Sequence, residues 1–153
     1  MGEVTYEQAN LLLRLYELRR ESRLREARAW FYSHFEAGTP EELLKKYPMG
    51  SAESASLRMV ITYWDMAAGL VNRGLIDDEM FFENSAEGWI VWERMKALVP
   101  AQRTRLKNPA YLAHLENFAR RYEAWRERTA PGSLEAFRQA QANARRAAAK
   151  SAD

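Results

Sequence analysis

The sequence contains no cysteine, and this absence excludes several kinds of site. Disulfide bonds, thiol nucleophiles, iron–sulfur clusters and cysteine-based zinc sites all require that residue. Glycine and proline are also scarce, at 7 and 5 of 153 residues. This scarcity favours long helices over strands and turns, and neither period-two alternation nor hairpin turns are found. The sequence therefore predicts an all-α protein.

Long hydrophobic runs are missing as well. The longest apolar stretches, Leu11–Leu13 and Met66–Val71, fall far short of the ~20 residues that a membrane-spanning helix needs. The segment Met1–Tyr16 lacks the basic start and apolar core of a secretory signal. We therefore expect a soluble, cytoplasmic protein with no membrane span.

The composition suits a single folded core. Hydrophobic residues make up 47% and charged residues 29% of the chain, which is ordinary for a globular domain of this length. We predict one compact bundle of six or seven helices over residues 1–140. Residues 141–153 are rich in alanine and basic side chains, and we expect this tail to be frayed or disordered.

Caps and 3.6-residue periodicity place the expected helices. Seven of them are Thr5–Arg20, Ser22–Phe35, a short helix between Thr39 and Tyr47, Ala55–Arg73, Ala86–Leu106, a helix from Asn108 to about Arg128, and a last helix from Ser133. A further short helical segment, not counted among the seven, is expected after its cap Asp77. Pro100 is expected to bend Ala86–Leu106 or to end its first half.

The stretch Leu57–Arg105 is predicted to organise the fold. It contains three of the five tryptophans, and its first helix is apolar over more than half of its circumference. Such a helix is usually surrounded by others. A second periodic signal lies further on, where aromatic and leucine residues recur at steps of four and three. This stripe, which predicts either core packing or a helix-pairing surface, consists of Tyr111, Leu115, Phe118, Tyr122 and Trp125.

Known catalytic motifs are absent from the sequence. It has no glycine-rich phosphate loop, no His-Glu-x-x-His helix, no serine elbow and no paired glutamates of the di-iron type. His34 and His114 fall on different expected helices, so a metal site would require them to meet in space. The sequence therefore favours a protein that is not an enzyme and has no cofactor or metal.

Two groups of residues remain as candidate sites. An apolar pocket with a few polar groups could form among the central helices; its residues would be Tyr63, Trp64, Asp65, Trp89, Trp92, Arg94 and Arg103. The alternative is a packed core with ion pairs at its rim. A candidate anion-binding patch comprises Arg19, Arg20, Arg23, Arg25 and Arg28. The alternative there is a solvated helix face with local ion pairs.

The central stretch resembles a known family. The segments YWDMA (63–67) and NRGLID (72–77), with Trp92, Glu93 and Arg103, are similar to an uncharacterised family of bacterial all-helical domains of unknown function. The resemblance covers roughly residues 57–121. It implies a helical bundle with no assigned activity. Many members carry an N-terminal membrane segment, which we do not find here, so membrane tethering is not implied.

These observations favour a non-enzymatic interaction or scaffold protein. Its partner would be another protein or a second copy of the chain, because apolar helix faces serve as partner surfaces when they are exposed. The alternative function is a binding module for an anionic ligand or nucleic acid, through arginine-rich helix faces.

Overall fold

The computed structural model describes residues 2–151, and these residues form nine α-helices and no strand. The helices are α1 (Tyr6–Arg19), α2 (Ser22–His34), α3 (Pro40–Lys46), α4 (Ala52–Asn72), α5 (Asp78–Asn84), α6 (Glu87–Met95), α7 (Val99–Leu106), α8 (Ala113–Thr129) and α9 (Ser133–Lys150). The all-α class is confirmed, but six or seven helices was too few. One reason is that the segment expected as Ala86–Leu106 forms two helices, with Pro100 in the first turn of the second.

Side-chain caps start several helices where the sequence predicted them. Thr5 and Gln8 form a reciprocal capping box at α1, and Thr39 caps α3. Asp77 caps α5 by accepting a hydrogen bond from the Met80 N–H. The start of α4 was predicted three residues too late, because Ser51 is its cap and accepts from the Ser54 N–H.

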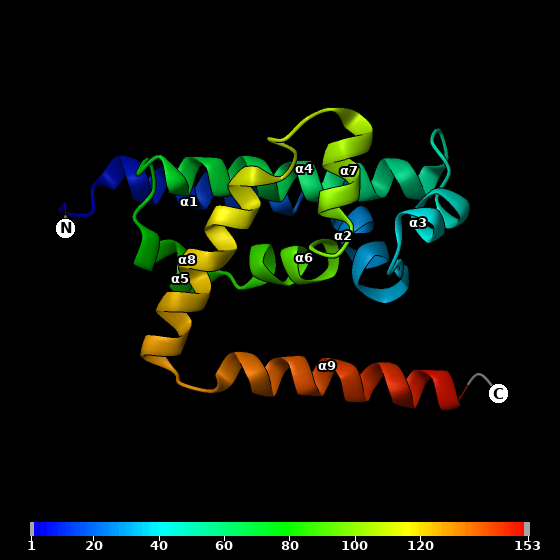
Figure 1. The fold of residues 1–153 in the computed structure, drawn as a ribbon. Coiled ribbons are helices and arrows are strands. Elements are labelled where there is room, and N and C mark those ends of the chain that lie inside the picture. The colour runs from blue at the N-terminus through cyan, green and yellow to red at the C-terminus, as the bar shows by residue number, and fades with distance from the viewer. Residues whose placement is uncertain (1, 152–153) are drawn as a thin grey trace. The chain divides into compact units, whose positions relative to one another are not determined.

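The long helix α4 is the centre of residues 2–119. It packs against α2, α5 and α6, and α1 packs against α2 (Figure 1). Its inward face is buried along the whole helix, from Leu57 to Val71. Gly88 on α6 permits a close crossing, because a Cβ atom there would lie 3.2 Å from the Trp64 ring and 3.0 Å from the Phe118 ring.

The connection between α7 and α8 differs from the expected one. Helix α8 begins at Ala113 rather than just after Asn108, since Leu112 has a left-handed backbone with φ of 52°. The Asn108 side chain accepts from the Ala110 N–H and so caps only a local turn. Helix α7 ends at Leu106, and the capping residue Lys107 is also left-handed.

The described chain divides into two compact units, residues 2–119 and 120–151, and the division falls inside the span 1–140 that was expected to be one domain. Helix α8 runs across the division. In the second unit, its end and α9 are joined by a turn in which Gly132 has a φ of 80°. An Arg126–Ser133 hydrogen bond of 3.0 Å and an Arg138–Glu123 ion pair of 3.1 Å connect the two helices.

Helix α9 continues to Lys150, through most of the segment that we expected to fray. Residues 142–151 are all exposed, so fraying of this end in solution stays a prediction. The last residues, 152–153, lie outside the described part. No helix within residues 2–151 combines the length and apolar character needed to cross a membrane.

Candidate functional site

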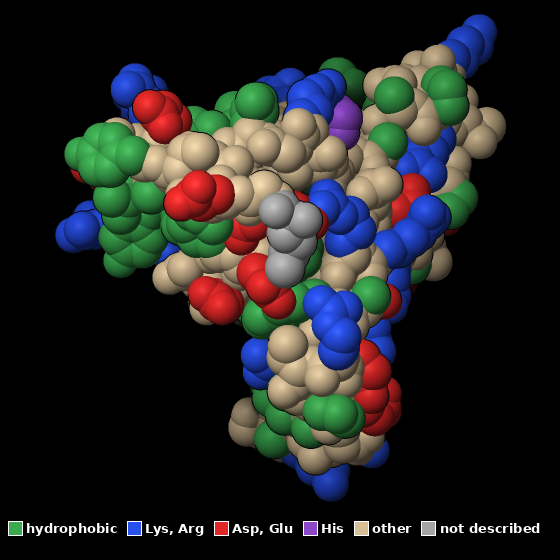
Figure 2. Space-filling model, turned by 90° about the vertical axis from the view of Figure 1, so that its left-hand side faces the viewer, with side chains coloured by type: hydrophobic (Ala, Val, Ile, Leu, Met, Phe, Trp, Pro, Cys, Tyr) green, Lys and Arg blue, Asp and Glu red, His purple; other side chains and the backbone are tan. Residues whose placement is uncertain are grey.

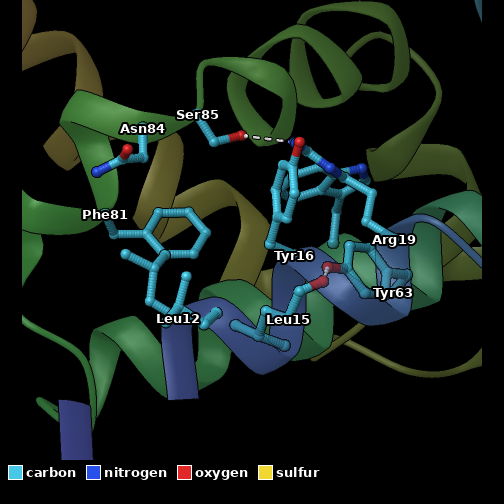
Figure 3. Close-up of a pocket in the computed structure, with 10 residues that line it drawn as sticks. Leu12, Leu15, Tyr16, Arg19, Tyr63, Phe81, Asn84 and Ser85 are labelled. Carbon is cyan, nitrogen blue, oxygen red and sulfur yellow. Dashed lines mark hydrogen bonds between the residues drawn. The ribbon is translucent and has the colours of Figure 1, made fainter. Parts of the chain in front are cut away.

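A cavity of about 360 Å³ opens between α1, α4 and α5, and we call it the α1 cavity (Figure 3). Its walls are mostly apolar, with polar groups at one end where Arg19, Asn84 and Ser85 lie. The lining residues are Leu12, Leu13, Leu15, Tyr16, Arg19, Tyr63, Trp64, Phe81, Asn84 and Ser85. Its size is within the range of small-molecule sites, and it is equally large enough to receive a side chain of another protein.

A carboxylate flanked by two arginines lies beside this cavity. Glu87, at the start of α6, binds the Arg28 guanidinium through two nitrogens, one of them at 2.7 Å. The same carboxylate pairs with Arg19 at 3.3 Å. All three side chains are less than one-fifth exposed. This network ties α1, α2 and α6 together and fixes the polar end of the α1 cavity.

Two tyrosines near this network have raised pKa values. Burial raises the pKa of Tyr63 to about 12, while the nearby Arg19 acts in the opposite direction. The Tyr63 hydroxyl donates to the Leu15 carbonyl and so joins α4 to α1. Burial, followed by the negative charge of Glu87, raises the pKa of Tyr32. Both phenols are therefore neutral at physiological pH and are poor general bases.

A second, larger cavity of about 620 Å³ extends along the other side of α4, and we call it the α4 groove. The segment from α3 to the start of α4, together with α7, the α7–α8 connection and the start of α8, forms its remaining walls. Nine of its 22 lining residues are leucine, isoleucine or methionine, and three are arginines, Arg58, Arg73 and Arg105. Asp65 is the only acidic residue in the lining.

The candidate pocket residues fall at several places. Tyr63 and Trp64 line the α1 cavity, whereas Asp65 lines the α4 groove. Trp89 is buried and Trp92 is half-buried on α6. Neither tryptophan lines either cavity.

The two candidate arginines of the central stretch stabilise the ends of helices. Arg94 donates to the Phe31 and Tyr32 carbonyls at 2.8 and 3.1 Å, and so caps the end of α2. Arg103 donates to the Tyr111 carbonyl at 3.0 Å and pairs with Glu116 at 2.8 Å, which secures the entry to α8. Both guanidinium groups are therefore engaged in contacts that hold helices together.

The five arginines of the candidate anion patch differ in their surroundings. Arg19 and Arg28 are paired with Glu87, while Arg20, Arg23 and Arg25 are exposed. Arg19 and Arg20 also lie over the Tyr16 ring, at 4.9 and 5.8 Å from its centroid. Two of the five arginines therefore share one carboxylate within the fold.

Sequence reasoning missed Glu87 and the three groove arginines. Glu87 is 59 positions from Arg28 and 68 from Arg19 in the sequence. A local sequence pattern cannot predict contacts between residues so far apart. Arg58, Thr62 and Asp65 could have been recognised as a polar stripe of α4 that continues to its cap Arg73, because positions 58, 62, 65 and 73 fall on one face of a helix.

The histidines do not form a metal site in the described residues. His114 lies beside Arg73, with 3.5 Å between its Nε2 and the Arg73 Nη2, and His34 is exposed at the end of α2. Within residues 2–151, no three histidine, aspartate or glutamate side chains are grouped so that they could hold a metal ion.

The helices of residues 2–119 define an all-α fold built around one central helix. The chain belongs to the family described as Domain of unknown function (DUF4760), whose family model matches residues 4–122. This confirms the resemblance to an uncharacterised family and extends it to α1, α2 and α3. No curated protein and no solved structure gives a significant match to the chain.

Proposed function

We propose that this protein is a non-enzymatic interaction protein of the cytoplasm that associates with a second copy of itself through α1. The observation that carries this proposal is the outward face of α1. Tyr6, Leu13 and Tyr16 are 79%, 60% and 50% exposed, and apolar side chains that are exposed together, rather than singly, are typical of a partner surface.

These three side chains form one stripe. Their spacing of seven and three residues places them on the same face of a helix. Leu15 lies on the opposite face and is buried. Hydrophobic side chains are visible at the surface of the end where the chain begins (Figure 2), where Val4 is also about half exposed.

The charges along α1 favour an antiparallel pair. Glu3 precedes α1 and Glu7 lies in its first turn, whereas its second half contains Arg14 and Glu17 and is capped by Arg20, which leaves that end net basic. If two copies cross with Leu13 against Leu13, the acidic start of each helix faces the basic end of the other. A parallel pair would place like charges together, which is unfavourable.

The α1 cavity adds a recess next to this stripe. Leu13 and Tyr16 belong both to the exposed face and to the lining of the cavity. An aromatic or leucine side chain of the second copy can therefore enter the recess, as knobs enter holes in packed helices. Filling a recess with an apolar side chain is a common source of binding energy at interfaces.

Anion or nucleic-acid binding through the arginine-rich face of α1 and α2 is the less favoured function. Glu87 pairs with both Arg19 and Arg28, so these two guanidinium groups are engaged within the fold and the patch offers a polyanion less than its five arginines suggest. If nucleic acid binds, the affinity should fall steeply with salt concentration, whereas self-association through an apolar stripe should not.

Light scattering coupled to size-exclusion chromatography tests the proposal. The wild type should be a dimer at low and high salt, and Leu13→Glu should be a monomer because it places a charge at the centre of the stripe. Leu75→Glu is the matched control, since Leu75 is 51% exposed but lies between α4 and α5. This control should remain dimeric.

A wild type that is monomeric at every concentration would overturn the proposal. A dimer that survives Leu13→Glu but dissociates in Leu75→Glu would assign the interface elsewhere and would equally contradict it. Circular dichroism of each variant shows whether its helices are intact.

A further inference from the structure

We propose that the α4 groove binds an elongated anion with an aliphatic body, such as a medium- or long-chain acyl carboxylate. This site is separate from the α1 face, and the inference does not depend on self-association. It rests on the shape of the groove, the kind of apolar residues that line it and the excess of arginine over carboxylate.

The groove is long rather than round. Its lining includes residues of α4 from Ser54 to Arg73, which corresponds to roughly 28 Å of helix at 1.5 Å per residue. Its volume of about 620 Å³ is within the range of ligand sites. A cavity of this length fits an extended chain better than a compact metabolite.

The apolar lining consists mainly of flexible aliphatic side chains. Four of these are exposed although they are large and hydrophobic: Leu44 (45%), Met49 (80%), Met66 (47%) and Leu106 (44%). Aromatic surfaces suited to stacking a planar ring are few, with only Tyr47 and Tyr111 in the lining. Methionine and leucine adapt to an aliphatic chain, and an acyl chain would cover the apolar area that now faces water.

The charge of the lining favours an acidic head group. Arg58, Arg73 and Arg105 oppose a single carboxylate, Asp65. That carboxylate is engaged, because its Oδ1 accepts a hydrogen bond from the Leu115 N–H at 2.9 Å. The groove therefore presents a net positive charge to a ligand.

Arg105 is the best-placed residue to hold the head group. Its Nε donates to Gln102 at 2.8 Å, while its two terminal nitrogens have no acceptor among the described residues. The Arg58 guanidinium likewise has no hydrogen-bond acceptor among residues 2–151. Arg73 is more engaged, since it donates to the Gly69 carbonyl at 3.1 Å. Guanidinium groups bind carboxylates in a bidentate manner, with good geometric match.

Tyr111 supplies a second polar group at the same place. Burial raises the pKa of its phenol, Arg105 acts against this effect, and Asp65 adds to it. Tyr111, Arg105 and Asp65 all line the groove, and the phenol is protonated at neutral pH. It is available as a donor to a carboxylate bound at Arg105.

Methionine-methyl NMR of the full chain with sodium dodecanoate, below its micelle concentration, tests the site directly. Met49 and Met66 line the groove, so their methyl signals should shift and saturate at one ligand per chain. Met59 is 37% exposed on the same helix but is not in the lining, and Met95 is fully buried on α6. These two signals should not move.

Two further ligands separate the contributions of the chain and the charge. Hexanoate has the carboxylate head group of dodecanoate, but its acyl chain is too short to fill the groove. Dodecyltrimethylammonium has an alkyl chain of the same length and a positively charged head group. Both should bind much more weakly than dodecanoate. Equal binding of the cation would overturn the anionic preference, and movement of all methionine signals together would indicate non-specific surfactant binding and overturn the site.

An arginine variant with a matched control tests the head-group position. Arg105→Gln should weaken dodecanoate binding by roughly tenfold, the value of one hydrogen bond to a charged group. Arg25→Gln removes the same charge from an exposed position on α2, outside the groove, and should leave the affinity unchanged. If both variants weaken binding equally, only net charge matters and the head-group assignment is wrong.

An acyl chain could also be presented by a membrane. Cosedimentation with phosphatidylglycerol vesicles distinguishes this source from a free acyl anion. We expect no cosedimentation, because the groove is recessed between helices. Vesicle binding that Arg105→Gln abolishes, without binding of free dodecanoate, would overturn the free-ligand proposal.

Discussion

Asp65 on α4 caps α8 across 50 positions of sequence, because its Oδ1 accepts a hydrogen bond from the backbone N–H of Leu115 at 2.9 Å. Leu115 lies in the first turn of α8, where backbone N–H groups have no partner within the helix. The carboxylate also meets the positive end of the helix dipole. The central helix therefore determines where α8 begins, and Asn72 assists by donating to the His114 carbonyl at 2.9 Å.

Replacing Asp65 should lower stability through this cap. We expect Asp65→Ala to reduce the free energy of unfolding by about 1 kcal/mol, the usual value of a capping side chain. Asp65→Asn should lose less, because its amide oxygen can still accept the bond. Urea denaturation followed by circular dichroism measures both. Equal losses in the two variants would show that charge, rather than the hydrogen bond, is the main contribution.

Replacing Glu87 should have a larger effect. Glu87→Gln leaves the half-buried Arg19 and Arg28 without a negative partner, and we expect a loss of about 2 kcal/mol in the free energy of unfolding. Lys96→Gln is the control, because it breaks an exposed i,i+3 pair with Glu93 and should change stability by less than about 0.5 kcal/mol. Similar losses in the two variants would contradict the role of the Glu87 network.

Two glycines in helices should respond in opposite ways to alanine. Gly88→Ala would place a methyl group against the Phe118 and Trp64 rings, and we expect a loss of about 1–2 kcal/mol from overpacking. At Gly69 the nearest atom is the flexible end of Arg73, at 2.9 Å. Gly69→Ala should therefore be neutral or stabilising, by up to about 1 kcal/mol of helix propensity. Thermal unfolding of the two variants compares them, and a stabilising Gly88→Ala would contradict the close crossing.

Alkaline pH should destabilise the fold in part through Tyr63. Burial raises its pKa to about 12 in the folded chain, against about 10 when unfolded. Below pH ~10 the phenol is neutral in both states and costs nothing. Above that pH the unfolded state ionises first, so stability is lost as pH rises toward the folded pKa.

The Tyr63→Phe variant tests this pH effect. It should be less stable than the wild type near neutral pH, because it lacks the hydrogen bond to the Leu15 carbonyl, but it should lose less stability as the pH rises. Urea denaturation across an alkaline pH series measures both. A parallel pH dependence in wild type and variant would assign the alkaline loss to other groups.

Local signals in the sequence predicted most helix starts. Thr5, Thr39 and Asp77 cap helices because each acts through neighbours three residues away, and such short-range chemistry can be read directly. The left-handed residue at Gly74, with φ of 72°, follows from the same kind of local rule.

Long-range contacts could not be predicted in this way. Asn108 followed by a proline has the pattern of a helix start, yet α8 begins at Ala113 because Leu112 is left-handed and Asp65 provides the cap from another helix. The pairing of Glu87 with Arg19 and Arg28 likewise depends on how α1, α2 and α6 meet. For the same reason, the sequence grouped Asp65, Arg94 and Arg103 as one candidate pocket, while the fold uses each at a different helix end.

The most direct test of self-association through α1 uses the absence of native cysteine. Single cysteines at Leu13 and at Tyr6 are introduced separately, and each variant is oxidised and analysed on a non-reducing gel. In an antiparallel pair centred on Leu13, the two Leu13→Cys side chains meet within disulfide distance, so this variant should form a covalent dimer rapidly. The two Tyr6→Cys side chains lie at opposite ends of the pair and should not cross-link. Rapid cross-linking of Tyr6→Cys, or none of Leu13→Cys, would contradict the proposed interface.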